Sequence, residues 1–207
     1  FADEKNEIKY KDLLKEAKSL GFSIHNKINK KLRLPIVVFV DRNIESLIAF
    51  MGVAYSGNFY VPIDIQMPKL RIELILQTLN PIATLVMDEN KSFATSVAPN
   101  LLTLIYEEEK VKEFDDNILG QIRKCIIDRD PIYATFTSGS TGIPKGVITC
   151  HQSVVDMTDN LVSNFGFNEN SIFGNQNPFY FDASIKDIYS SLKCGATLYI
   201  LPRSYFM

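Results

Sequence analysis

A run of small and hydroxylated residues near the middle of the chain has the composition of a polyphosphate-binding loop. Residues 137–146 read Thr-Ser-Gly-Ser-Thr-Gly-Ile-Pro-Lys-Gly and follow residues 132–136, which predict a strand. Small residues let the backbone approach an anion, N–H groups and hydroxyls donate to its oxygens, and a lysine supplies charge. A flexible Gly/Ser turn is the alternative, which the residue order and the terminal Pro-Lys-Gly disfavour. The candidate phosphate-binding residues are Thr137, Ser138, Gly139, Ser140, Thr141, Gly142, Lys145 and Gly146.

The spacing within this loop excludes two common nucleotide-binding motifs. Gly139 and Gly142 stand three residues apart, and Lys145 is followed by Gly146. A Walker A loop needs Gly, four residues and then Gly-Lys-Ser/Thr, and a Rossmann site needs Gly-x-Gly-x-x-Gly. Neither pattern is present in these residues.

The loop instead resembles the phosphate loop of the adenylate-forming enzymes, which include acyl-CoA synthetases, luciferases and the adenylation domains of peptide synthetases. Residues 8–13 and 51–64 are similar to the first and second core motifs of adenylation domains, in the same order. The resemblance therefore runs from near residue 8 to the end of the chain. It implies that the loop binds the β- and γ-phosphates of ATP. It also implies that the lysine that assists adenylation comes from a later part of the enzyme, so Lys145 is not given that role.

A fourth segment, Phe181-Asp182-Ala183-Ser184, resembles the motif that amino-acid-activating members place beside the substrate. The resemblance implies that Phe181 and Asp182 bind substrate, with the aspartate paired to the α-ammonium group. An ammonium that enters a pocket needs a counter-charge to offset its lost hydration. The alternative role for Asp182 is a helix N-cap, because apolar residues follow it at helical spacing.

Lys186 lies four residues after Asp182, so both side chains can point the same way from one helix. The resemblance implies that this position lines the pocket for the substrate side chain, where the family usually has an apolar or aromatic residue. One hypothesis is that Lys186 meets an acidic substrate such as glutamate or aspartate. The other is a surface ion pair with Asp182, worth a few tenths of a kcal/mol.

Bulk composition argues against several other classes of function. The 207 residues are 46% apolar and carry a net charge of −2, which gives no reason to propose a nucleic acid or an anionic membrane as partner. The odd number of cysteines, three, has no disulfide spacing and favours a reducing cytoplasm. Two histidines without a Cys-x-x-Cys pair do not support a zinc site, and no metal-binding residue is assigned.

Alternation of strand-like and helical patterns predicts an α/β fold, with largely parallel sheet layers flanked by helices. Apolar residues recur at helical spacing over residues 13–28, and the run 36–40 is apolar without alternation, as in a strand covered on both faces. Asn43 is expected to cap a helix that ends before Gly57. The other expected strands are 59–63, 83–87, 101–106, 132–136, 172–175 and 196–201, and the other expected helices begin near Pro68 and after residues 150 and 182. Residues 107–118 are expected to form an exposed acidic connector.

The resemblance implies ATP-dependent activation of an amino acid, with Mg²⁺, to an aminoacyl-adenylate and pyrophosphate. The acyl group would then pass to the thiol of a phosphopantetheinylated carrier protein. Residues 1–207 would be part of the large N-terminal domain, without the adenine-binding segment or the C-terminal domain that supplies the catalytic lysine. No catalytic residue is assigned within the chain, and the piece alone is expected to adenylate little or nothing. A CoA ligase for a simple acid, a D-alanine–carrier protein ligase and a non-catalytic nucleotide-binding module stay open as alternatives.

Overall fold

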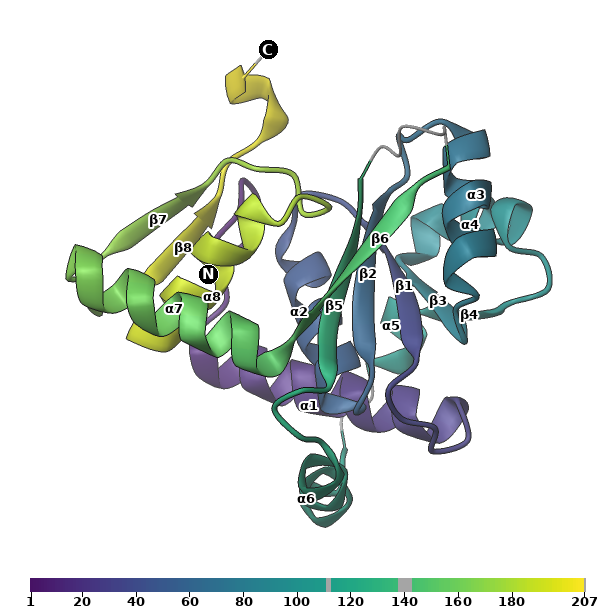
Figure 1. The fold of residues 1–207 in the computed structure, drawn as a ribbon, viewed down its shortest axis with the longest axis horizontal. Helices are drawn as coiled ribbons and strands as arrows, with labels where there is room; N and C mark the ends of the chain where they lie inside the picture. Colours follow the sequence, from purple (N-terminus) through teal and green to yellow (C-terminus); the bar gives the residue numbers. More distant parts are fainter. Residues whose placement is uncertain (111–112, 138–142, 207) are drawn as a thin grey trace.

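A six-stranded sheet forms the centre of the computed structural model, which describes residues 1–110, 113–137 and 143–206 (Figure 1). Its strand order is β4-β3-β1-β2-β5-β6, and every neighbouring pair is parallel except β5 with β6. The strands are β1 (Pro35–Val40), β2 (Phe59–Asp64), β3 (Ala83–Val86), β4 (Leu102–Ile105), β5 (Pro131–Thr137) and β6 (Lys145–Cys150). The predicted α/β class with a largely parallel sheet is confirmed.

Helices cover both faces of this sheet, which explains why β1 is apolar at every position. Ile36 and Val38 face a core shared with the first two helices, whereas Val37 and Phe39 face a second core shared with the next two. The covering helices are α1 (Tyr10–Lys27) and α2 (Ile44–Tyr55) on one side, and α3 (Lys69–Leu79) and α4 (Lys91–Val97) on the other. The central strands are therefore fixed from both sides.

Local signals place the ends of α2 and α3. The Asn43 side chain accepts a hydrogen bond from the Ser46 backbone N–H at 3.0 Å, which confirms the expected cap. Gly57 follows α2 with a φ of 81°, a conformation that residues with a side chain rarely adopt. Pro68 immediately precedes α3, where the sequence places the start of that helix.

A second, smaller unit packs beside the main sheet (Figure 1). It consists of a parallel pair, β7 (Ile172–Asn175) and β8 (Thr197–Ile200), with α7 (His151–Phe165), α8 (Ala183–Cys194) and a short η2 (Arg203–Phe206). Phe179 of this unit stacks edge-on against Phe50 of α2, with ring centroids 5.7 Å apart. The two sheets thus share one apolar core. Among the described residues, no helix has both the length and the hydropathy that a membrane span requires.

Several elements differ from the expectation. Residues 107–118 do not form an exposed connector throughout, because α5 (Tyr106–Glu109) and the start of α6 (Asp116–Cys125) fall within them. Glu109 is buried and accepts a hydrogen bond from the Ser23 hydroxyl at 2.6 Å, with Lys27 at 3.5 Å. The strand β6 was not predicted, and its apolar Val147 and Ile148 are exposed on the sheet edge. Helices α4 and α6 and the short η1 (Asp88–Asn90) were also not predicted.

The connections after β1 and β2 diverge to opposite faces of the sheet. The chain leaves β1 into α2 on one face and leaves β2 into α3 on the other. In open α/β sheets, such a reversal opens a crevice outside the carboxyl ends of the strands, where ligands bind. The functional site is therefore expected next to Asp41 and Asp64.

Glycines bring α1 and α2 into close contact, and this contact generates a stability prediction. A Cβ at Gly21 would lie 2.6 Å from the Tyr55 Cβ and 2.8 Å from the Gly52 carbonyl oxygen. We expect Gly21→Ala to lower the free energy of unfolding by about 1–3 kcal/mol, because the helices must separate. Gly120→Ala is the matched control in α6, where no atom lies within 4 Å, and it should raise stability by up to about 1 kcal/mol. Urea unfolding of both variants tests this, and a stabilised Gly21→Ala would contradict it.

Candidate active site

A cleft of about 640 Å³ lies at the carboxyl ends of β2 and β5. Its walls come from the loop after β2, the facing ends of β5 and β6, the segment before α8, and Arg203. The volume is in the range that holds a small-molecule ligand. Asp64 lines the cleft, as the divergent connections predict, whereas Asp41 is not among the lining residues.

Of the three phosphate-loop candidates that the structure describes, Thr137 lines this cleft, whereas Lys145 and Gly146 are not among its lining residues. Thr137 ends β5 and lines the cleft, and it pairs in the antiparallel ladder with Lys145, the first residue of β6. Ser138, Gly139, Ser140, Thr141 and Gly142 lie outside the described residues. The loop therefore connects the two strands of a hairpin, not a strand and a helix.

Gly146 has a packing role in this hairpin. It pairs with Phe136, and a Cβ added to Gly146 would lie 3.1 Å from the Phe136 ring. Phe136 itself lines the cleft. A side chain at position 146 would therefore push the ring of Phe136 and alter the wall beside the loop.

Phe181 and Asp182 line the same cleft, so the structure brings the two predicted sites together. Asp182 occupies the N-cap position of α8, yet its side chain makes no capping hydrogen bond and its backbone is already helical, with φ −59° and ψ −27°. The alternative reading of Asp182 as a side-chain cap is therefore wrong. Its exposed carboxylate stays available to a ligand.

Tyr133 of β5 is a phenol whose electrostatic environment includes the Asp182 carboxylate. Burial raises the pKa of Tyr133, and the negative charge of Asp182 raises it further. Tyr133 also lines the cleft. A side-chain hydrogen bond with Thr149 partly opposes this rise in the pKa of Tyr133, and the phenol stays neutral at pH 7.

Lys186 is exposed one turn further along α8 and is not among the residues that line the cleft. Within the described ranges, no ion pair joins it to Asp182. The surface ion-pair hypothesis is therefore wrong for this structure. The structure places Lys186 on the helix that carries Asp182, outside the cleft wall.

Sequence reasoning missed the charged residues on the opposite wall. Asp64 ends β2 and is buried, and Arg203 donates to its carboxylate and to the side chain of Gln66. Arg71 of α3 lines the cleft beside them. Asp64, as an acidic residue at the end of an apolar strand, could have indicated this wall from the sequence. Its partner Arg203 could not, because it lies 139 residues away along the chain.

Comparison with solved structures shows which proteins share this fold. The N-terminal subdomain of Klebsiella oxytoca NpsA superposes with a TM-score of 0.80 at 20% identity, over 97% of this chain and 49% of that one. VinN in complex with L-aspartate gives a TM-score of 0.79 at 19% identity, over 96% and 56%. The chain therefore shares the fold of these two proteins, the first of which is an N-terminal subdomain.

Sequence comparison then identifies the family. Residues 1–206 match the family described as AMP-binding enzyme, and the chain belongs to that family. A D-alanine–D-alanyl carrier protein ligase of Listeria innocua is 32% identical over 197 residues, which is 95% of this chain. The chain spans 38% of the length of that relative.

The free carboxylate of Asp182 leads to a prediction about stability. We expect Asp182→Ala to change the free energy of unfolding by less than about 0.5 kcal/mol, because it removes no hydrogen bond. Asn43→Ala, which removes a working cap, should lower it by about 1 kcal/mol. Urea titrations of both variants make the comparison. Equal destabilisation by the two would show that Asp182 serves the helix.

Proposed function

We propose that the chain is part of an enzyme that joins the carboxylate of an amino acid to ATP, forming an aminoacyl-adenylate and pyrophosphate. The observation that carries the proposal is the shared cleft, which Thr137 at the phosphate loop and the unpaired Asp182 carboxylate both line. A site for the ATP phosphates and a site for the substrate ammonium in one cleft would bring the two reactants together. Membership of the AMP-binding family supports the same chemistry.

In this mechanism a carboxylate oxygen of the substrate attacks the α-phosphorus of ATP. A new oxygen–phosphorus bond forms, the bond to the bridging oxygen of the β-phosphate breaks, and pyrophosphate leaves with that electron pair. Catalysis of this kind is mostly positioning and charge stabilisation. The loop residues Thr137, Ser138, Gly139, Ser140, Thr141, Gly142, Lys145 and Gly146 are proposed to hold the departing pyrophosphate.

ATP fits the described walls of the cleft chemically. The hydroxyls of Thr135, Thr137 and Thr149 and the guanidinium of Arg71 line it, and all are donors to phosphate oxygens. Mg²⁺ bound with the nucleotide would neutralise part of the triphosphate charge. We assign this ion no ligand in the described part of the chain, where no group of three or more acidic, cysteine or histidine side chains is placed to hold a metal ion.

Phe181 and Asp182 are proposed to bind the amino acid, with Asp182 opposite the α-ammonium group. The aminoacyl group would then pass to the thiol of a phosphopantetheinylated carrier protein in the cytoplasm. The relatives named as carrier protein ligases support this second step. A CoA ligase for a simple acid would have no use for an unpaired carboxylate in its cleft.

Two substrate classes are proposed for separate tests. Similarity to D-alanine–carrier protein ligases favours a small amino acid. An acidic amino acid is the second class, because Lys186 lies one turn after Asp182 on α8, although outside the described cleft wall, and because VinN is a protein of the same fold whose solved complex contains L-aspartate. Residues 1–207 are proposed to be a partial N-terminal domain, so the tests use the full-length protein that carries this segment. The 207-residue chain alone should form little or no adenylate.

The proposed role of Asp182 predicts a loss of exchange activity that is specific to substrates with an amino group. Asp182→Ala should reduce amino-acid-dependent ATP–pyrophosphate exchange by about 10- to 100-fold, which corresponds to a lost hydrogen bond to a charged group. Exchange supported by the same acid without its amino group should be unchanged. Equal activity of the variant and the parent on the amino acid would refute the proposal. Loss with both substrates would point to damage elsewhere in the cleft.

The position of Lys186 on α8 leads to a prediction about the side chain of the amino acid substrate. If the substrate is acidic, Lys186→Met should lower exchange with L-glutamate and L-aspartate by about 10-fold or more and leave D-alanine unaffected. Lys193→Met is the matched control, because Lys193 lies on the same helix and pairs at 2.7 Å with Asp159. A parent protein that shows no preference for acidic amino acids would end the acidic hypothesis.

A further inference from the structure

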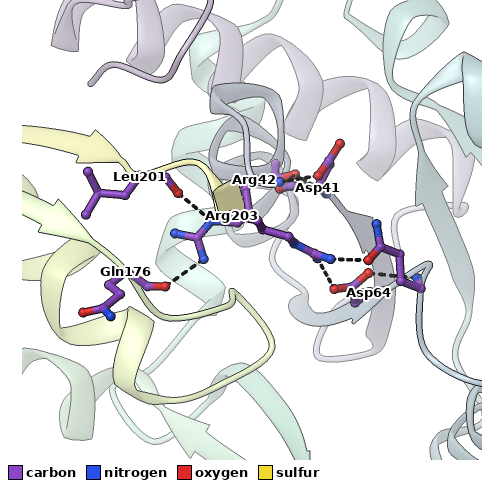
Figure 2. Close-up of polar contacts among 8 residues, drawn as sticks. Asp41, Arg42, Asp64, Gln176, Leu201 and Arg203 are labelled. Carbon is purple, nitrogen blue, oxygen red and sulfur yellow. Dashed lines mark hydrogen bonds and ion pairs between the residues drawn. The ribbon is translucent and has the colours of Figure 1, made fainter. Parts of the chain in front are cut away.

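Two arginines cross between the main sheet and the smaller unit in opposite directions (Figure 2). Arg203, which follows β8, donates to Asp64 and Gln66 at the end of β2. Arg42, which follows β1, donates to backbone carbonyls at the ends of β7 and β8. Arg203 lines the cleft, whereas Arg42 is not among the lining residues.

Arg42 binds three carbonyl oxygens with one guanidinium group. Its Nε donates to Leu201 at 2.8 Å, its Nη1 to Gln176 at 2.9 Å and its Nη2 to Asn175 at 2.6 Å. These carbonyls lie where the β7–β8 ladder ends, and the Asn175 carbonyl also accepts from the Leu201 backbone N–H at 3.1 Å. The planar fork of arginine matches such a set of acceptors, which a lysine ammonium cannot reproduce.

Arg42 is held firmly in this position. Its backbone N–H donates to the Asp41 carboxylate at 2.7 Å, and its side chain is half-buried. Burial, together with the nearby charge of Arg203, lowers the pKa of Arg42, although the guanidinium stays protonated at neutral pH. Hydrogen bonds to the three carbonyls therefore replace water that the Arg42 guanidinium loses on burial.

Asn175 connects this contact to α8. Its fully buried side chain donates to the Asp187 carboxylate at 3.0 Å and to the Ser184 carbonyl at 3.5 Å. Ser184 in turn donates from its hydroxyl to the Phe181 carbonyl at 2.7 Å. The segment that carries Phe181 and Asp182 into the cleft is thus tied at its start to Arg42 and at its end to the first turn of α8.

We propose that Arg42 is a positioning residue, which holds the Asp182 carboxylate in the cleft through Asn175, Gln176 and the segment that follows. The inference deepens the proposed function, since it rests on Asp182 as the site of the substrate ammonium. Arg42 touches neither the phosphate-loop flank nor Asp182 in the described contacts. Its loss should therefore weaken the amino acid site and spare the nucleotide site.

The test compares Arg42→Ala and Arg42→Lys in the full-length protein by ATP–pyrophosphate exchange. The probe is whichever of D-alanine, L-glutamate and L-aspartate the parent uses best. Arg42→Ala should raise the KM for the amino acid by about 10-fold or more and leave the KM for ATP within about 2-fold, with Arg42→Lys in between. A proportional rise in both KM values, or no rise in either, would overturn the proposal.

Arg33→Ala is the matched control. Arg33 also joins a carboxylate, Asp130 at 2.8 Å, and a backbone carbonyl, Cys125, but it precedes β1, at the opposite end of the strands. It should lower the unfolding midpoint without changing the KM for the amino acid. A KM effect equal to that of Arg42→Ala would show that general loss of stability explains both.

A double variant shows whether Arg42 acts through Asp182. The effect of Arg42→Ala on the KM for the amino acid should disappear in an Asp182→Ala background, because coupled residues are not additive. An effect of the same size in both backgrounds would overturn the inference. If Asp182→Ala alone leaves amino acid activation intact, it is the proposed function that fails.

Hydrogen exchange gives a readout that is independent of activity. In Arg42→Ala the amides of residues 177–185 should exchange about 10-fold faster or more, while those of β1 and β2 keep their rates. Arg33→Ala should leave residues 177–185 unchanged. Unchanged exchange in Arg42→Ala would overturn the positioning role even if Asp182 proves essential.

Discussion

The divergence of the connections after β1 and β2, to opposite faces of the sheet, is the constraint on which the site depends. Adjacent parallel strands deliver their carboxyl ends to one edge, and α2 and α3 then draw the chain to opposite faces. Ligands bind at such divergent strand ends in open α/β sheets, and Asp64 at the end of β2 lines the cleft. The phosphate-loop flank at the end of β5 reaches the same edge because β5 pairs parallel with β2.

The cleft wall that carries Phe181 and Asp182 belongs to the smaller unit with its own sheet. Both apolar packing and polar contacts therefore fix its position relative to the main sheet. Phe50, Tyr60 and Phe179 join the two units through a common apolar core, with the Phe50 and Tyr60 rings stacked at 4.4 Å. Apolar packing is tolerant of small shifts in direction, whereas hydrogen bonds weaken steeply with misalignment. The arginines at the open edge therefore supply the directional component that packing lacks.

The sequence predicted those parts of the fold whose signals are local. Continuous apolar residues marked β1 because both of its faces are covered, and Asn43 marked the start of α2 because a cap acts within one turn. The strand β6 escaped prediction because an edge strand that leaves Val147 and Ile148 exposed has no alternating pattern. Glu109 was assigned to an exposed connector because the burial of a carboxylate depends on Ser23, far away in sequence. Asp182 was found through its motif, but Arg42 and Arg203 act across distances that no local pattern encodes.

The geometry at the start of α8 distinguishes two roles for Asp182, helix cap and ligand-binding carboxylate, which the sequence alone could not distinguish. An aspartate whose side chain capped the helix would be stabilised there by the backbone N–H groups, and a ligand ammonium would compete with them. The backbone of Asp182 is instead already helical, and the Ser184 hydroxyl bonds the Phe181 carbonyl at the same turn. The helix start is thus held by neighbours, which leaves the carboxylate without a structural partner at the edge of an open cleft. The Asp182 carboxylate is therefore not used by the helix, yet tertiary contacts hold its segment in place. A ligand-binding group needs both properties.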